Sequence, residues 1–146
     1  MLKETIALET LRQKIEKAEY DAGSSSDYLD YGRPDESQAM AARETIAKKM
    51  KEAELLKAEL HTLIEQSPKG AIEEWVNWHK AVLEKILLEP EINSHTKTRA
   101  NTARKTLVEW ENVLTREREY VSINWHFLKD YKEKAGKEFK NSWWKF

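Results

Sequence analysis

The amino-acid sequence predicts an all-α fold, namely an elongated helical bundle with a long antiparallel helical hairpin and coiled-coil character. Three observations lead to this prediction. First, 35% of the 146 residues are charged, but only four are glycine and three are proline, a composition typical of long helices. Second, apolar residues recur at intervals of four and three over long stretches, which is the spacing of one helix face. Third, no segment shows a convincing strand-like alternation of apolar and polar residues.

A chain of this length can bury one core without metal ions or disulfides, so we expect residues 1–146 to form a single domain. The first helix is predicted over residues 2–20, because apolar residues recur there at roughly helical spacing and form its predicted buried face: Leu2, Ile6, Leu11, Ile15 and Ala18. Residues 21–35, DAGSSSDYLDYGRPD, predict a loop because they are rich in glycine, serine, proline and aspartate. Tyr28 and Tyr31 are unusual in a linker, so we expect this loop to dock on something.

The second helix is predicted over residues 36–66, with Asp35 and Gln38 as its capping box. Its apolar stripe has the 4,3 spacing of a coiled-coil seam and includes one lysine. The third helix is predicted over residues 68–88, with Ser67 as its N-cap. Its apolar face carries Ile72, Trp75, Val76, His79, Val82, Leu83 and Ile86.

The fourth helix is predicted over residues 94–135, where nine positions keep the 4,3 spacing. These positions are Ala103, Leu107, Trp110, Leu114, Glu117, Val121, Asn124, Leu128 and Tyr131. The short connection at residues 89–93 predicts an antiparallel hairpin of the third and fourth helices. A helix of about 40 residues is roughly 60 Å long. We therefore expect an elongated molecule, a broken helix, or a helix that continues into another subunit.

The 25 basic and 26 acidic residues nearly cancel, so any interaction with nucleic acid or a membrane has to be local. Residues 1–66 hold 10 basic and 14 acidic residues, whereas residues 67–146 hold 15 and 12. The acidic first part is thus expected to attract the basic second part, within one chain or between subunits. The chain has no cysteine, which removes disulfides and thiolate chemistry. It shows no secretory leader or spanning segment, so we expect a cytoplasmic protein without stable membrane insertion.

Residues 92–107, INSHTKTRANTARKTL, contain four basic residues and no acidic one. These basic residues are Lys97, Arg99, Arg104 and Lys105, and they alternate with hydroxyl and amide side chains. Such donors near a helix N-terminus suit a phosphate group. One hypothesis is therefore a helical protein that binds nucleotide or nucleic-acid phosphates here. The alternative is a solvated basic turn that pairs with the acidic first part of the chain.

Three polar residues, His79, Glu117 and Asn124, lie on otherwise apolar stripes. A histidine and a carboxylate between helices can bind a metal or transfer a proton, which gives another alternative, an enzyme with an interhelical His/Glu site. However, the spacings match no metal signature, and no nucleophile or nucleotide-binding motif is present. We expect these residues to satisfy one another or to fix helix register. No catalytic residue, metal or cofactor is predicted.

The chain ends in KNSWWKF, so that Phe139, Trp143 and Phe146 can extend the last helical stripe, with Trp144 beside it. This aromatic tail, residues 136–146, either caps its own core, packs on another copy or another protein, or contacts a membrane surface or nucleic-acid bases. The function predicted from the sequence is that of a non-catalytic helical protein that self-associates and binds a protein partner. Regulators, adaptors and inhibitors of this type are common in bacteria and phages.

Overall fold

The computed structural model describes residues 2–114 together with Tyr120, Ser122, Ile123, Trp125 and Leu128. Within this part of the chain four helices follow one another, α1 (Lys3–Tyr31), α2 (Glu36–Gln66), α3 (Lys69–Leu87) and α4 (Ser94–Leu114). The same residues contain no β-strand. The predicted all-α helical bundle is therefore confirmed, whereas its coiled-coil character stays a prediction. None of the described helices is long and apolar enough to cross a membrane.

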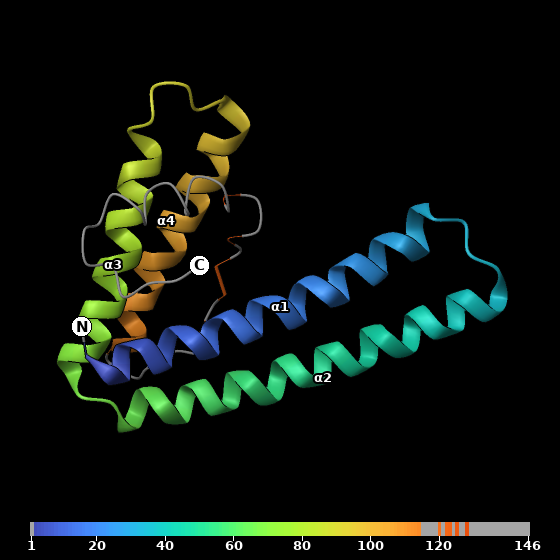
Figure 1. Ribbon diagram of the computed structural model, residues 1–146, viewed down its shortest axis with the longest axis horizontal. Coiled ribbons are helices and arrows are strands. Elements are labelled where there is room, and N and C mark those ends of the chain that lie inside the picture. Colours follow the sequence, from blue (N-terminus) through green and yellow to red (C-terminus); the bar gives the residue numbers. More distant parts are fainter. Residues whose placement is uncertain (1, 115–119, 121, 124, 126–127, 129–146) are drawn as a thin grey trace.

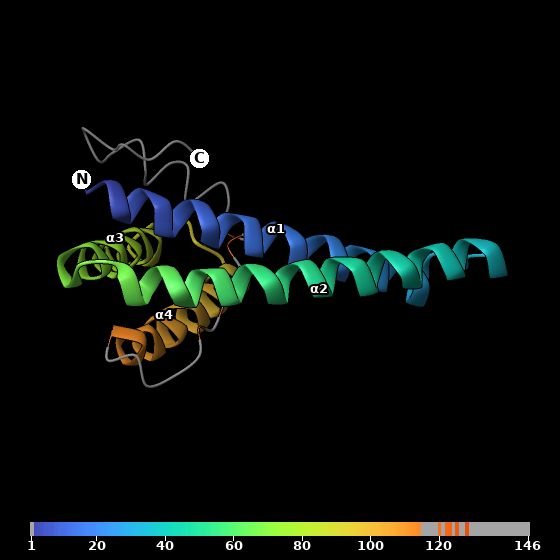
Figure 2. The same cartoon turned by 90° about the horizontal axis from the view of Figure 1, so that it is seen from below.

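The helices form two antiparallel hairpins that meet at one end (Figure 1). α1 and α2 make a long hairpin, and α3 and α4 make a shorter one, as the short connection between them predicts. α1 packs on both α2 and α3. The outer ends of α1 and α2 project well beyond α3 and α4 in both views (Figures 1 and 2). The part of this hairpin that contains residues 19–50 is called the arm below.

The loop predicted over residues 21–35 is wrong, because α1 continues as a helix to Tyr31. Gly23 and the serines after it are poor helix formers, and a glycine costs about 1 kcal/mol relative to alanine. This cost is offset by packing along the hairpin. Ala18 and Ala22 on α1 are buried, and so is Ala39 on α2. Tertiary packing therefore overrides local propensity in this stretch.

The signals that end α1 lie at residues 32–34. A Cβ atom on Gly32 would lie 2.5 Å from Cδ2 and 2.7 Å from the carbonyl oxygen of Tyr28, so this position requires glycine. Arg33 adopts a φ of 48°, in the left-handed region. The next residue is Pro34, and a proline disfavours the helical conformation in the residue before it. Together these residues turn the chain from α1 into α2.

The N-terminus of α2 is capped as predicted. Oδ1 of Asp35 accepts a hydrogen bond from the backbone N–H of Gln38 at 2.7 Å, and Oε1 of Gln38 accepts one from the N–H of Asp35 at 3.1 Å. The predicted cap of α3 by Ser67 is wrong. Its hydroxyl donates to the carbonyl oxygen of Leu63 at 2.6 Å, and Pro68 occupies the N-cap position. The Ser67 side chain thus closes the last turn of α2.

We expect Asp35→Ala to lower the free energy of unfolding by about 1 kcal/mol, because the first turn of α2 loses its side-chain acceptor. Asp35→Asn keeps an acceptor at the same place and serves as the matched control. Urea denaturation measures the difference, and hydrogen exchange of the Gln38 amide locates it. Equal stabilities of the alanine and asparagine variants would contradict a role of the side chain as a cap.

The core lies where α1, the end of α2, α3, α4 and the described residues after α4 meet. The predicted buried face of α3 is confirmed, since all seven of its residues are buried. On α1 the prediction is only partly right. Leu11, Ile15 and Ala18 are buried, but Leu2 and Ile6 are 44% and 40% exposed. The buried face of α1 is rotated from the predicted one, and it includes charged residues.

The helix predicted over residues 94–135 is wrong beyond the bounds of α4, because Tyr120, Ser122, Ile123 and Trp125 are not helical. Ile123 and Trp125 are both buried in the core, although they are only two positions apart. Two such residues point to nearly opposite sides of a helix, so a straight helix cannot bury both against one neighbour. The predicted aromatic tail, residues 136–146, lies outside the described residues.

Candidate functional site

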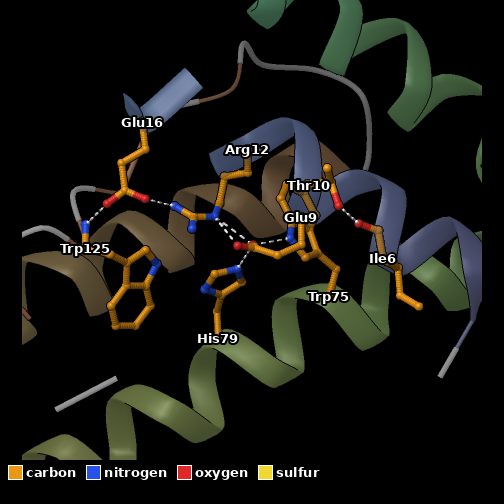
Figure 3. A network of polar contacts seen from close by, with 8 residues as sticks. All are labelled: Ile6, Glu9, Thr10, Arg12, Glu16, Trp75, His79 and Trp125. Carbon is orange, nitrogen blue, oxygen red and sulfur yellow. Dashed lines mark hydrogen bonds and ion pairs between the residues drawn. The ribbon is translucent and has the colours of Figure 1, made fainter. Parts of the chain in front are cut away.

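A cluster of buried charged residues lies where α1 crosses α3 (Figure 3). Glu9 and Arg12, one helical turn apart on α1, have no exposed side-chain surface. Nε of Arg12 lies 2.7 Å from each carboxylate oxygen of Glu9. A buried charge is costly unless it is paired and hydrogen-bonded, so Glu9 and Arg12 each need the other in order to be buried.

Glu9 also binds two side chains of α3. Nε1 of Trp75 donates to Oε1 of Glu9 at 2.9 Å, and Nε2 of His79 lies 2.5 Å from the same oxygen. The tryptophan and arginine nitrogens can only donate, so they require an acceptor carboxylate. An ionised Glu9 offers enough lone pairs for Arg12, Trp75 and His79 together, and Nε2 of His79 is then a donor as well. One carboxylate therefore holds α1 and α3 in a fixed register.

Glu16 connects the cluster to the chain after α4. Its Oε2 accepts a hydrogen bond from Nη1 of Arg12 at 2.9 Å, and its Oε1 accepts one from the backbone N–H of Trp125 at 2.7 Å. Burial alone would lower the pKa of Arg12, but the charges of Glu9 and Glu16 raise it above its ordinary value, so the guanidinium stays protonated. Arg12 is thus the central cation between two carboxylates.

Burial raises the pKa of Tyr120, and the charge of Arg12 lowers it by less, so the phenol stays neutral. The hydroxyl of Tyr120 and Nη2 of Arg12 are both buried, and neither has a hydrogen-bond partner among the described residues. The buried phenol therefore adds no further charge to the cluster.

Aromatic rings enclose His79. Its ring stacks on Trp125 with 5.5 Å between the centroids, and it makes T-shaped contacts with Trp78 and Trp110 at centroid distances of 5.1 and 5.0 Å. Trp75 stacks on Trp110 at 4.5 Å. The His79 side chain is fully buried, so no solvent-open cleft reaches it. This environment suits a structural joint between the two hairpins.

The sequence places His79, Glu117 and Asn124 together as interhelical polar residues. The structure places His79 against Glu9 of α1, while Glu117 and Asn124 lie outside the described residues. In the described part of the chain, no group of three or more histidine and acidic side chains is arranged to hold a metal ion.

Sequence reasoning missed Glu9 and Arg12 because it selected only apolar residues for the buried face of α1. A signal was present, since Thr5, Leu8, Arg12 and Ile15 follow one another at intervals of three, four and three. All four are buried. An arginine at such a position, with glutamates three residues before it and four after it, indicates a buried ion network rather than a solvated charge.

The end of the arm has a surface of a different kind. No residue between 23 and 38 is buried, and the structure describes this range in full. Residues 21–36 contain five acidic side chains and one basic side chain; we call this segment the acidic tip. The acidic residues are Asp21, Asp27, Asp30, Asp35 and Glu36. Two tyrosines lie among them, Tyr28 at 39% and Tyr31 at 82% exposure.

The predicted phosphate-binding residues, Lys97, Arg99, Arg104 and Lys105, all lie on α4, but not on one face. Lys97, Asn101, Arg104 and Val108 follow one another at intervals of four, three and four, and Lys105 lies beside them. We call these five residues the basic face. Lys97, Arg104, Lys105 and Val108 are exposed, and Nη2 of Arg104 donates to Oδ1 of Asn101 at 2.8 Å.

Arg99 lies elsewhere on α4. Its Nε donates to Nε2 of His95 at 2.9 Å. The Arg99 side chain also lines a hollow of about 310 Å³. The lining residues are Thr98, Arg99, Thr102, Ala103, Thr106, Ser122 and Ile123. The hydroxyls of Thr98, Thr102 and Thr106 donate to backbone carbonyls within α4, so they are acceptors toward a ligand and poorly suited to phosphate.

The first turn of α4 is also partly occupied. Oδ1 of Asn93 accepts a hydrogen bond from the N–H of Thr96 at 2.7 Å, which leaves one free N–H fewer for an anion. Phosphate binding therefore stays a prediction from the sequence. The predicted partner-binding residues Phe139, Trp143, Trp144 and Phe146 lie outside the described residues.

Comparison with known proteins gives no relative from which a function can be transferred: no protein-family model, no curated protein and no solved structure matches this chain.

Proposed function

We propose that this chain is a non-catalytic helical protein that acts by binding other protein chains, its own copies included, through the arm. The observation that supports this proposal is the contrast between the two ends of the α1–α2 hairpin. At the inner end, Leu60 and Ile64 are fully or almost fully buried in the core. At the outer end, the helices project away from α3 and α4 (Figure 1) and bury no residue between 23 and 38.

Without a partner, the arm gains little stability from the burial of apolar surface. Residues 19–27 share a hollow with Ser122 and Ile123, but farther out the two helices bury little apolar surface, and isolated pairs of this kind are marginally stable. The arm nevertheless exposes large apolar side chains, Tyr31 at 82%, Met40 at 56% and Met50 at 49%. Tyrosine and methionine are enriched at protein interfaces, where they contribute apolar area and adapt to a partner. These side chains are consistent with a surface that another chain covers.

The buried charge cluster supports the same function indirectly. Glu9 and Arg12 fix α1 against α3, and Glu16 fixes it to Trp125. The direction in which the arm leaves the core is thus set by charged hydrogen bonds, whose geometry is stricter than that of apolar contacts. A rigidly directed arm loses less conformational freedom when it binds a partner.

The proposal is tested with a photo-crosslinking amino acid in place of Tyr31, expressed in the native host, with Leu88 at the end of α3 as the control position. Leu88 is 80% exposed and therefore equally accessible. We expect discrete protein adducts from position 31 and none of the same mass from position 88. Any protein so identified is purified, and its affinity for the Tyr28→Ser/Tyr31→Ser variant should fall about 10-fold or more. Adducts that are absent or equal at both positions would contradict the proposal.

A further inference from the structure

The arm and α4 carry opposite charge on surfaces that do not meet within one chain. Both views show the acidic tip at the end of the arm, away from α3 and α4 (Figures 1 and 2). The acidic tip has five acidic residues and one basic residue, while residues 92–107 have four basic residues and no acidic one. From this complementarity we propose that the acidic tip of one chain binds the basic face of α4 on a second copy of the same chain. This inference rests on the proposed binding function of the arm and names its partner.

The acidic tip offers a compact binding patch. Asp27, Asp30 and Tyr31 lie three or four positions apart or adjacent on the last two turns of α1, so their side chains share one side of the helix. All three are exposed. A carboxylate pair beside a tyrosine ring matches a surface of lysine and arginine, because guanidinium groups pair with carboxylates and stack on aromatic faces.

The basic face offers the complementary groups in a row. Lys97 and Arg104 lie two helical turns apart, and Lys105 lies next to Arg104. Val108 continues the row and is 59% exposed, which places an apolar side chain beside the cations. In an interface of this composition, the charged groups provide specificity and the apolar contact adds affinity.

The shape of the chain makes the contact reciprocal. Each copy has one arm with an acidic tip and one shorter hairpin with a basic face, and the two hairpins diverge (Figure 1). When the tip of the first copy lies on the second copy's α4, a two-fold axis brings the second tip onto the first copy's α4. This arrangement closes as a dimer and uses both surfaces twice.

The test exchanges the charges of the two surfaces in the full-length chain and measures association by analytical ultracentrifugation. One variant carries Asp27→Lys and Asp30→Lys, and the other carries Lys97→Glu and Arg104→Glu. Lysines near the end of α1 and a glutamate near the start of α4 both suit the helix dipole, so neither variant should lose its fold. Circular dichroism confirms this. The matched control, Lys14→Glu/Lys51→Glu, reverses two exposed lysines outside both surfaces.

We expect the wild-type chain and the control variant to form dimers. Each charge-reversed variant alone should associate about 100-fold more weakly, because like charges then face each other. An equimolar mixture of the two variants should recover a dimer, because both of its contacts join opposite charges: the reversed tip on the reversed face, and the unchanged tip on the unchanged face. Wild-type association should also weaken from about 0.01 M to about 1 M salt, as the Debye length falls from about 30 Å to about 3 Å.

Three results would overturn the inference: a monomeric wild-type chain at low salt, dimers that persist in both reversed variants, or a mixture that fails to associate. The general binding function is judged separately by crosslinking at position 31. If the wild-type chain is monomeric but position 31 captures a different protein that binds through the tyrosines, the inference and the self-association part of the proposed function fail, whereas binding of another protein through the arm stands. If neither self-association nor a specific adduct is found, both fail.

Discussion

Replacing Arg12 with methionine is expected to lower the free energy of unfolding by about 3–5 kcal/mol, the range typical for breaking a buried ion pair. Methionine fills most of the same volume but carries no charge. The variant leaves Glu9 fully buried without its arginine, and Glu16 loses its ion pair as well. Urea denaturation followed by circular dichroism measures the loss.

The control for this variant is Arg43→Met, which removes an exposed arginine from α2 and should change the stability by no more than about 0.5 kcal/mol. If the cost at position 12 arises from uncompensated charge, adding Glu9→Gln should recover part of it, so that the double variant is more stable than additivity predicts. A loss below about 1 kcal/mol, or strict additivity, would show that the ion network contributes little. If Arg12→Met does not fold, Arg12→Lys is compared with the wild type instead. Lysine keeps the charge but not the planar donor geometry, so it should lower the free energy of unfolding by less.

The sequence was informative wherever one physical effect dominated. Apolar spacing alone identified the buried face of α3, because this helix is amphipathic and short. The capping box of Asp35 and Gln38 was likewise predictable, since it depends on residues three positions apart. Such local or strictly periodic features are largely independent of the rest of the fold.

The sequence was misleading wherever packing competed with local preference. The stretch around Gly23 reads as a loop, but the burial of Ala22 along the hairpin keeps it helical. After α4 the 4,3 spacing predicted a continuing helix, whereas Ile123 and Trp125 are both buried in non-helical chain. Neither outcome can be derived from a single segment, because each depends on which partner helix lies alongside.

Of the two candidate surfaces, one could be recognised from the sequence and the other could not. The basic residues of α4 were recognisable as a group, and helix geometry then separates Arg99 from Lys97 and Arg104. The acidic tip was hidden by its interpretation as a loop. Its significance depends on the three-dimensional arrangement, in which the arm projects away from the rest of the chain and leaves Tyr31 in solvent. The ion network was missed because charged residues were assigned to the surface by default.

The second large effect is expected at Trp75, whose indole both packs in the core and donates to Glu9. Trp75→Ala should lower the free energy of unfolding by about 3–5 kcal/mol, because it leaves a cavity beside Trp110, on which the indole stacks. Trp75→Phe keeps a ring in the stack but removes the N–H donor. It should cost about 2 kcal/mol, the contribution of a hydrogen bond to a charged group.

The two Trp75 variants separate the roles of the indole, and Tyr31→Ala provides the control for loss of an exposed ring, with a change of no more than about 0.5 kcal/mol expected. If Trp75→Phe is as stable as the wild type, the indole acts by packing alone, and Glu9 is adequately held by Arg12 and His79. If Trp75→Phe is as destabilised as Trp75→Ala, the hydrogen bond to Glu9 dominates. A stability of Trp75→Phe between those of the wild type and Trp75→Ala is expected only if both core packing and the buried carboxylate fix α1 to α3. This is the arrangement that directs the arm.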